Sequence, residues 1–217
     1  MKLSFASKNA LPPEPPKPDV ILSSQSIGRK MLLEKLGVRF RVVVTRVDED
    51  AIMDKKPETM IKKRAAAKAL EVVANPRVYS IPEERESLIV AADSMAILGS
   101  KTFGKSTDRE DTKNMLKALM GKTHNIVTAV HIVLAQNNSI TKTWEKTVTT
   151  KVTFRKMNTV EIESYVSRFD FTRFAAGYAL NEAPWDLVTR VDGSYTNVIG
   201  LPFEVLLPIL RSLKIII

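Results

Sequence analysis

A short polar turn follows the first apolar run of the chain and has the residue types of an anion-binding site. The run Val20–Leu22 predicts a buried strand, and the pattern after Arg29 predicts a helix that ends at Gly37. Ser24 and Ser26 lie between the strand and the helix. The first N–H groups of a helix have no intrahelical partner, and the helix dipole favours negative charge there. The turn therefore has two interpretations, an anion-binding site beside Arg29 or a plain N-cap, and this stretch alone does not decide between them.

A lysine stands on the apolar face of the longest expected helix, which runs from Pro57 to about Ala74. Lys68 lies three residues after Ala65 and four before Val72, so its side chain follows the apolar stripe of the helix. Its amine must either extend past the core to solvent or point into a cleft. The second arrangement is the one that a phosphate-binding site requires.

An acid interrupts the apolar run 88–98, which otherwise predicts a buried strand. A carboxylate inside an apolar segment is costly unless another group pairs with it, so Asp93 is expected to have a partner. Two interpretations stay open. Asp93 is either a functional carboxylate or a turn residue between the two strands of a hairpin.

Two further charged segments follow predicted elements. Residues 48–50 are acidic and follow the strand expected over 39–45. Clustered carboxylates at a strand end can hold a divalent cation, although a solvated loop often has the same composition. Lys105 lies beside Gly104 in the turn before another helix.

The elements that must position these residues alternate first and then become adjacent strands. Strands are predicted over 126–135 and 144–154, as in an antiparallel hairpin. Asn158 and Glu161 form a capping box for the next helix, and a last helix starts near Gly200. This order predicts the α/β fold class, with a mixed sheet that carries helices on its faces.

Length and proline content predict the domain organisation. The 217 residues are enough for one large domain with a sizeable core, which we assign to residues 20–217. Residues 1–19 hold five of the eleven prolines, so this segment is predicted to be an extended proline-rich arm.

Composition limits the partners. Lys and Arg total 33 against 24 Asp and Glu, and the formal net charge of +9 attracts polyanions. Aromatic residues are only 6% and the basic residues are scattered, so a small polyphosphate ligand is favoured over a nucleic acid. No apolar run approaches the roughly 20 residues of a membrane span, and the N-terminus lacks the apolar region of a signal peptide. We therefore expect a cytoplasmic protein.

Cysteine and histidine usage limits the metal chemistry. With no cysteine, any metal must bind oxygen atoms or the two histidines, which favours magnesium or manganese. His124 and His131 lack the spacing partners of a metal site, so we interpret both as structural or surface residues.

Several segments, taken in order, resemble the Maf family of nucleoside triphosphate pyrophosphatases, whose fold is similar to that of the inosine triphosphate pyrophosphatases. The resemblance extends from Val20 to Leu210 and is carried by SSQSIGRKMLLEKLG, AAAKA, AADS, FGKS, LMGKTH, VTF and GSYTNVIGLP. It implies an elongated, twisted sheet with two lobes and a cleft between them. It also implies hydrolysis of a (d)NTP to the monophosphate and pyrophosphate, with dTTP and UTP or modified pyrimidine nucleotides as the expected substrates. The AADS and GSYTNVIGLP segments look more like the branch acting on dTTP and UTP than the branch acting on methylated GTP.

The resemblance implies a role for each singled-out residue. Asp93 would activate the attacking water and, with Glu49, hold the divalent cation, Mg²⁺ or Mn²⁺. The residues that would surround the triphosphate are Ser24, Ser26, Arg29, Lys68 and Lys105. The resemblance leaves a homodimer open, and neither a stable nucleic-acid partner nor a membrane is expected.

Five positions depart from the family pattern. Gly28 replaces the first of two adjacent arginines, which in relatives bears on substrate choice, and Ser94 replaces a threonine. Arg173 and Phe174 replace an aspartate–lysine pair, and Asn181 replaces a glutamine that contacts the base in relatives. Both expected catalytic carboxylates are kept. We therefore expect hydrolysis to persist and base selectivity to be the property that changes.

Two other classes of function stay open. One is a nucleotide-binding regulator of cell division with weak or no turnover, because relatives are associated with arrest of septum formation. The other is a basic nucleic-acid-binding protein, motivated by the net charge of +9. Titration with nucleic acid across a salt series separates the second, because phosphate-driven binding weakens steeply with salt.

Overall fold

The computed structural model describes residues 16–168, 170–182 and 186–217, and these residues build one seven-stranded mixed sheet. Its strands are β1 (Asp19–Ser23), β2 (Phe40–Val43), β3 (Ser87–Leu98), β4 (Lys101–Phe103), β5 (Thr123–Gln136), β6 (Ser139–Phe154) and β7 (Val188–Asp192). The strand order is β2-β1-β3-β5-β6-β7, and β4 pairs with β3 outside this path. β1 is parallel to both β2 and β3, and the other pairs are antiparallel. The predicted mixed α/β sheet is therefore confirmed.

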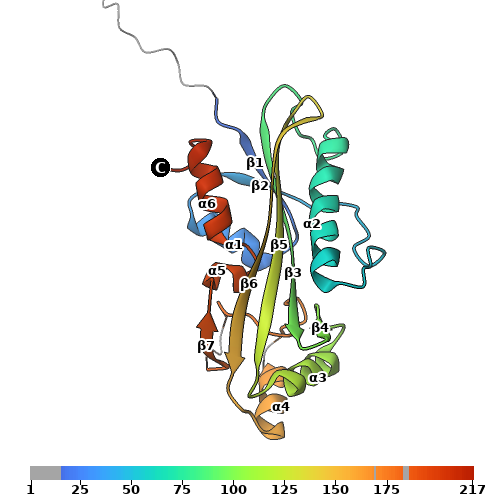
Figure 1. Cartoon of the computed structure of the whole chain (residues 1–217), viewed down its shortest axis with the longest axis vertical. Helices are drawn as coiled ribbons and strands as arrows, with labels where there is room; N and C mark the ends of the chain where they lie inside the picture. Colours follow the sequence, from blue (N-terminus) through green and yellow to red (C-terminus); the bar gives the residue numbers. More distant parts are fainter. Residues whose placement is uncertain (1–15, 169, 183–185) are drawn as a thin grey trace, which may run out of the picture.

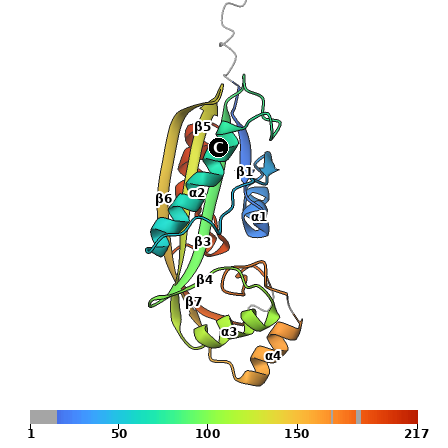
Figure 2. The same cartoon turned by 90° about the vertical axis from the view of Figure 1, so that its right-hand side faces the viewer.

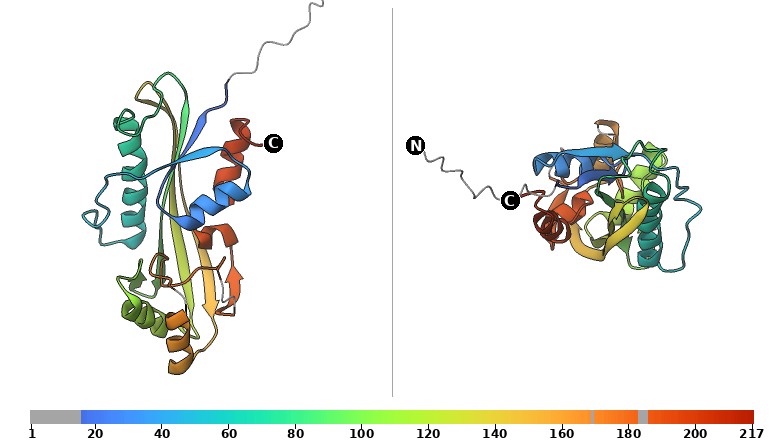
Figure 3. Two further views of the ribbon diagram at one scale, coloured as in Figure 1. Left: turned by 180° about the vertical axis from the view of Figure 1, so that it is seen from behind. Right: turned by 90° about the horizontal axis from the view of Figure 1, so that it is seen from above.

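Helices cover both faces of the sheet and one of its ends. They are α1 (Ile27–Lys35), α2 (Pro57–Ala74), α3 (Arg109–Leu119), α4 (Thr159–Arg168), α5 (Tyr195–Ile199) and α6 (Phe203–Ser212). α2 lies on one face, and α1 and α6 lie on the other (Figures 1 and 3). α3 and α4 gather at the far end of the elongated sheet (Figure 2).

Alternation along the central strands determines which side chains meet which helix. Successive side chains of a strand point to opposite faces, so the residues of β3 divide into two sets. Leu88 and Val90 pack in the cluster that contains α1 and α6 residues, whereas Ile89 and Ala91 pack against α2. Asp93 continues the second set and therefore lies on the face that α2 covers.

The long hairpin of β5 and β6 forms the spine of the sheet. Its turn is made by Asn137 and Asn138, whose φ angles are 50° and 59°. Two consecutive residues with positive φ match the type I′ turn that suits the twist of a hairpin. The antiparallel hairpin predicted from the sequence is confirmed.

β3 runs past its neighbours and leaves a gap along one edge. β1 pairs with β3 as far as Ala91, and β4 pairs with it from Ala96 onward. Within the described residues, the stretch 92–95 therefore has no strand beside it on that edge. β3 is continuous through this stretch, so the interpretation of Asp93 as a turn residue between hairpin strands is wrong.

Three short elements were not predicted from the sequence. β4 and β7 are only 3 and 5 residues long, and pairing with the longer strands β3 and β6 stabilises them. The 5-residue helix α5 follows Ser194, whose side chain caps the N-terminus of the helix. Elements this short carry little periodic signal of their own.

The structure also places the starts of β5 and β1 at other residues than the sequence predicted. β5 begins at Thr123 and includes both histidines, which are buried, so the surface option for His124 and His131 is wrong. Residues 1–15 of the predicted arm lie outside the described residues, and β1 already begins at Asp19. In the described part of the chain, no helix combines the length and the apolar character that crossing a membrane needs.

Candidate active site

A cavity of about 550 Å³ opens at the carboxyl ends of β1 and β2, beside the gap along β3. Ends of parallel strands where the chain order changes are common ligand sites in α/β proteins, and this volume falls in the usual range for such sites. The predicted site residues that line the cavity are Ser24, Ser26, Arg29, Glu49, Lys68, Asp93, Ser94, Lys105 and Asn181. Gly28 is the one predicted position that is not among the lining residues.

A buried lysine joins two carboxylates inside the cavity. Nζ of Lys68 lies 2.8 Å from Oε2 of Glu49 and 3.3 Å from Oδ1 of Asp93. The side chains of Lys68 and Asp93 are 5% and 15% exposed, whereas that of Glu49 is 42% exposed. Lys68 therefore points into the cleft, and the alternative in which it extends past the core to solvent is wrong.

Glu49 is presented by a tight turn after β2. Oδ1 of Asp48 accepts the backbone N–H groups of Asp50 and Ala51, at 3.1 and 3.2 Å, which shapes the turn. Burial would raise the pKa of Glu49, but attraction and a hydrogen bond from Lys68, with Arg29 and Lys105 further away, lower it overall. Glu49 is therefore an ionised carboxylate at neutral pH.

The turn between β1 and α1 is a true helix cap that also faces the cavity. Oγ of Ser26 accepts the backbone N–H of Arg29 at 3.4 Å, and Oγ of Ser24 accepts the N–H of Ser26 at 3.2 Å. Both serines line the cavity. The cap and the anion-binding interpretation are therefore compatible with each other.

The guanidinium of Arg29 is held by oxygen atoms of the protein. Nε donates to the carbonyl oxygen of Gly200 at 2.8 Å, Nη1 to Oγ of Ser24 at 3.0 Å, and Nη2 to Oγ of Ser94 at 2.9 Å. Ser94 also bonds the hydroxyl of Thr128 on β5 at 2.9 Å. Burial lowers the pKa of Arg29, and the charges of Asp93 and Glu49 oppose this shift. Arg29 thus ties α1, β3 and the end of α5 together at the cavity.

The opposite wall comes from the segment after α4. Lys105 forms an isolated antiparallel bridge with Ala175, so this segment is held beside the loop that follows β4. Arg173, Phe174 and Asn181 contribute to the lining. The wall combines an aromatic ring, an amide and a cation, which suits a planar polar ring better than a purely apolar ligand.

A buried pair of polar rings supports that wall from behind. The hydroxyl of Tyr178, which lines the cavity, bonds Nε2 of His124 at 3.1 Å. The Phe154 ring packs edge-on against both, with centroids 4.7 and 4.8 Å away. Burial lowers the pKa of His124 to about 4 and raises the pKa of Tyr178. Both groups are therefore neutral near pH 7 and act as structural supports.

Gly28 contacts α5. A Cβ atom at Gly28 would lie 2.8 Å from the backbone oxygen of Ile199 and 3.0 Å from its Cγ2. Close approach of α1 to α5 therefore requires a glycine here. Gly200, with φ of 117°, follows α5 and offers its carbonyl oxygen to Arg29.

Polar residues of the cavity lining that the sequence did not single out include Gln25, Arg64 and Thr107. Of these, Arg64 had a usable signal. It precedes Lys68 by four residues and so shares its side of α2. An arginine beside an apolar stripe is normally a solvated side chain, so this signal alone does not indicate a site.

The metal ligands that the cavity offers are two carboxylates. Among the described residues, no group of three or more His, Cys, Asp or Glu side chains could hold a metal ion. Glu49 and Asp93 nevertheless reach the same ammonium group and so lie close together. Hard oxygen donors of this kind, one or two per site and completed by substrate phosphates, are typical of Mg²⁺ sites.

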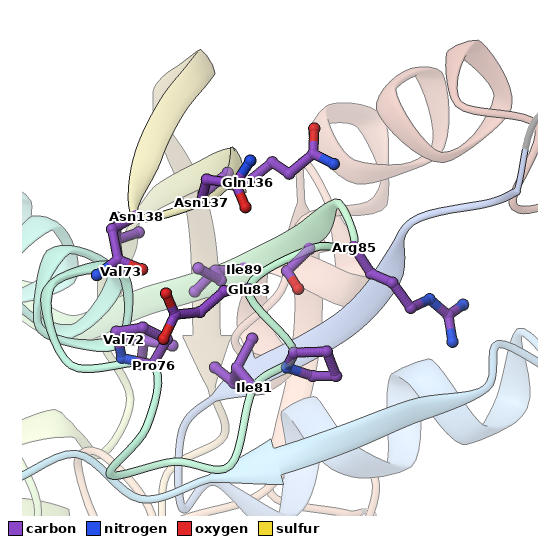
Figure 4. A pocket seen from close by; sticks show the side chains of 13 residues that line it. Val72, Val73, Pro76, Ile81, Glu83, Arg85, Ile89, Gln136, Asn137 and Asn138 are labelled. Carbon is purple, nitrogen blue, oxygen red and sulfur yellow. The ribbon is translucent and has the colours of Figure 1, made fainter.

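A second cavity lies near the C-terminal end of α2 and is far too small for a nucleotide. It measures about 20 Å³, enough for one water molecule, and its lining includes Val73, Ile81, Ser87 and Asn138 (Figure 4). Oγ of Ser87 is buried without a hydrogen-bond partner in the described structure.

The comparisons with known proteins agree on one family. The family model described as "Maf-like protein" matches residues 19–213. A dTTP/UTP pyrophosphatase of Aquifex aeolicus is 34% identical over 91% of this chain and 96% of its own length. Proteins of the same description from Akkermansia muciniphila and Pyrococcus furiosus are each 34% identical, over 90% and 88% of this chain and 97% and 94% of their own. With this coverage, the chain belongs to the Maf family.

Proposed function

We propose that this protein hydrolyses nucleoside triphosphates, with dTTP and UTP as substrates, to the monophosphate and pyrophosphate. The observation that carries the proposal is the Lys68 ammonium paired with Glu49 and Asp93 inside a cavity of about 550 Å³. The relatives support it, because those of Aquifex aeolicus and Pyrococcus furiosus are described as dTTP/UTP pyrophosphatases.

Asp93 is the proposed general base of this reaction. Oδ1 faces Lys68, which leaves Oδ2 to take a proton from the attacking water. The hydroxide adds to the α-phosphorus. The bond between this phosphorus and the oxygen that bridges the α- and β-phosphates breaks, and pyrophosphate leaves with the electron pair. Such a base typically contributes roughly 10²-fold to 10⁴-fold in rate. Lys68 fixes the orientation of the carboxylate during this step.

Glu49 and Asp93 would hold a divalent cation, Mg²⁺ or Mn²⁺, together with substrate phosphates. When bound, this ion would neutralise the negative charge that develops on the phosphate oxygens. Among the protein groups, Lys105 brings a further cation from the loop after β4. Ser24 and Ser26 add hydroxyls at the N-terminus of α1, where the helix dipole favours phosphate.

The wall formed by Phe174 and Asn181 is the proposed base site. The amide of Asn181 offers a donor and an acceptor, which the imide edge of uracil and thymine needs. Phe174 offers a ring face for stacking. The substitutions at Gly28, Ser94 and Asn181 are the positions that we expect to modify base preference relative to other members of the family.

Pyrophosphate release from a panel of triphosphates tests the proposal. The panel contains dTTP, UTP, dCTP and a modified pyrimidine triphosphate, each with Mg²⁺, with Mn²⁺ or with a chelator. We expect dTTP and UTP to give monophosphate and pyrophosphate in equal amounts, with loss of activity in the chelator. Release of orthophosphate instead, or no release from any member of the panel, would refute the proposed reaction.

A nucleotide-binding regulator of septum formation with little turnover is the weaker alternative. Both carboxylates and the lysine are present together in the cavity, which favours catalysis over binding alone. We further propose a cytoplasmic location. We also propose that no nucleic acid is a stable partner, because the positive charge is dispersed over the sequence. A homodimer stays an option that size-exclusion chromatography with light scattering can test.

A further inference from the structure

Five cationic side chains line the large cavity, and they differ in how many of their N–H donors already bind groups of the protein. They are Arg29, Arg64, Lys68, Lys105 and Arg173. Lys68 is paired with two carboxylates, and all three guanidinium nitrogens of Arg29 donate to protein oxygens. These two cations are therefore held in place before a ligand arrives.

Arg64 lies next to Lys68, but fewer of its N–H donors bind groups of the protein. It lies four residues earlier on α2, just over one helical turn or about 6 Å along the axis, on the same side of the helix. Nε donates to the carbonyl oxygen of Ile52 at 3.2 Å, and Nη2 lies 3.9 Å from Sδ of Met53. A thioether is a weak acceptor, and no carboxylate pairs with Arg64 within the described residues.

The donors that remain on Arg64 suit a phosphate. A guanidinium carries five N–H donors in a planar fork, and its contact to Ile52 uses one of them. The fork matches two oxygens of one phosphate group. The anchoring contact to Ile52 fixes the side chain at the cavity wall, so less rotamer freedom is lost when a phosphate binds.

The position of Arg64 assigns it to one end of the substrate. Arg64 contacts Ile52, whose backbone N–H donates to the carbonyl oxygen of Glu49 at 3.2 Å. The proposed base wall of Phe174 and Asn181 comes instead from the segment after α4. The nucleoside occupies that wall, so the end of the cavity at Arg64 is left for the phosphates beyond the reacting one. This step rests on the proposed function.

We infer that Arg64 binds the pyrophosphate half of the substrate and so makes the enzyme select triphosphates over diphosphates. Arg64 acts as a positioning and specificity residue beside the catalytic carboxylates. The competing explanation is that Arg64 only clamps the segment 48–56 to α2 through Ile52.

Lys63 is a matched control, because it clamps the same segment without lining the cavity. Its Nζ lies 2.8 Å from Oδ2 of Asp54, on the exposed side of α2. If clamping were the whole role of Arg64, Lys63→Ala and Arg64→Ala would have similar effects. If Arg64 binds pyrophosphate, only Arg64→Ala changes the affinity for that product.

The experiment measures binding of inorganic pyrophosphate and of dTMP to the full chain by calorimetry in Mg²⁺, with kcat and KM for dTTP and dTDP. We expect Arg64→Ala to weaken pyrophosphate binding by roughly 10-fold to 100-fold, the effect of losing a charge-assisted contact, and to leave dTMP binding unchanged. The preference for dTTP over dTDP should fall by a similar factor. Arg64→Lys should recover part of both, and Lys63→Ala should match the wild type.

Two outcomes overturn the inference: unchanged pyrophosphate binding in Arg64→Ala, or an equal loss in Lys63→Ala. Thermal unfolding of each variant shows that a loss of binding does not come from loss of fold. The direct binding measurement separates this inference from the proposed function. A wild-type protein that binds pyrophosphate through Arg64 but releases none from dTTP would refute the reaction and keep the binding site.

Discussion

Nζ of Lys68 lies 3.3 Å from Oδ1 of Asp93, so α2 and β3 are joined by an ion pair whose side chains are 5% and 15% exposed. Removing two charges from water costs more than their attraction usually returns, so such a pair is weak evidence for stability. Its location in the large cavity, on an open strand edge, instead favours a functional reason for keeping it.

The first prediction concerns the proposed base. Asp93→Asn keeps the shape of the side chain and leaves Lys68 paired with Glu49, but it removes the group that accepts the proton from water. We expect pyrophosphate release from dTTP to fall by at least about 10²-fold, with little change in the unfolding temperature. Asp192→Asn, on the exposed edge strand β7, is the control and should retain full activity. Near-normal turnover of Asp93→Asn would remove Asp93 from catalysis.

The second prediction concerns the cation between the two carboxylates. Lys68→Met keeps most of the side-chain volume but leaves Glu49 and Asp93 facing each other without their shared ammonium. Removing one partner of a fully buried ion pair costs about 3–5 kcal/mol, and the effect here should be smaller because Glu49 is 42% exposed. We expect KM for dTTP to rise and kcat to fall, measured by steady-state kinetics, with a lower urea midpoint. Unchanged kcat and KM would exclude Lys68 from the site.

Much of this site could be predicted from local sequence. Asp93 interrupts an apolar run and Lys68 interrupts an apolar stripe, and each needs a partner that the fold then supplies. The N-cap at Ser26 follows from its position between a strand and a helix. The capping box was also confirmed, since Asn158 and Glu161 bond each other's backbone N–H groups at 2.8 and 2.9 Å.

The rest depended on contacts between distant residues. Arg29 and Gly200 are 171 positions apart, and only the packing of α5 on α1 brings them together. The position of Arg64 at the cavity depends on the path of the segment after β2. The backbone oxygen of Ile52 fixes the Arg64 side chain, and a backbone oxygen has no sequence signature. The burial of His124 required knowing that β5 begins at Thr123 and that Tyr178 packs behind it.

The third prediction concerns pH and stability. Burial lowers the pKa of His124 from 6.5 to about 4, so the unfolded chain takes up a proton at a pH where the folded chain does not. The stabilisation is therefore complete above pH 6.5 and is lost as the pH falls from 6.5 towards 4. A shift of this size corresponds to about 3 kcal/mol. Urea unfolding at several pH values measures this loss.

Two variants separate the contributions of the histidines to that pH dependence. His124→Asn removes the titrating group and should flatten the dependence between pH 6.5 and 4. Burial also lowers the pKa of His131, although Glu145 at 3.0 Å opposes the shift, so His131→Gln should have the same sign and a smaller effect. An equally steep loss of stability in His124→Asn would contradict the assignment of the neutral form.

The fourth prediction concerns the glycine that departs from the family pattern. In Gly28→Ala, the new Cβ would lie 2.8 Å from the backbone oxygen of Ile199, and a backbone atom cannot move aside by changing rotamer. Alanine favours a helix over glycine by about 1 kcal/mol, whereas overpacking of a tight contact costs about 1–3 kcal/mol. We expect Gly28→Ala to lower the free energy of unfolding in urea. The control Lys30→Ala, on the exposed side of α1, should stay within about 0.5 kcal/mol of the wild type.

Gly28→Ala should also raise KM for dTTP, because α5 leads directly into Gly200, whose carbonyl oxygen anchors Arg29. A variant as stable as the wild type would show that α1 and α5 can separate at no cost, and the strict need for glycine at this position would be wrong.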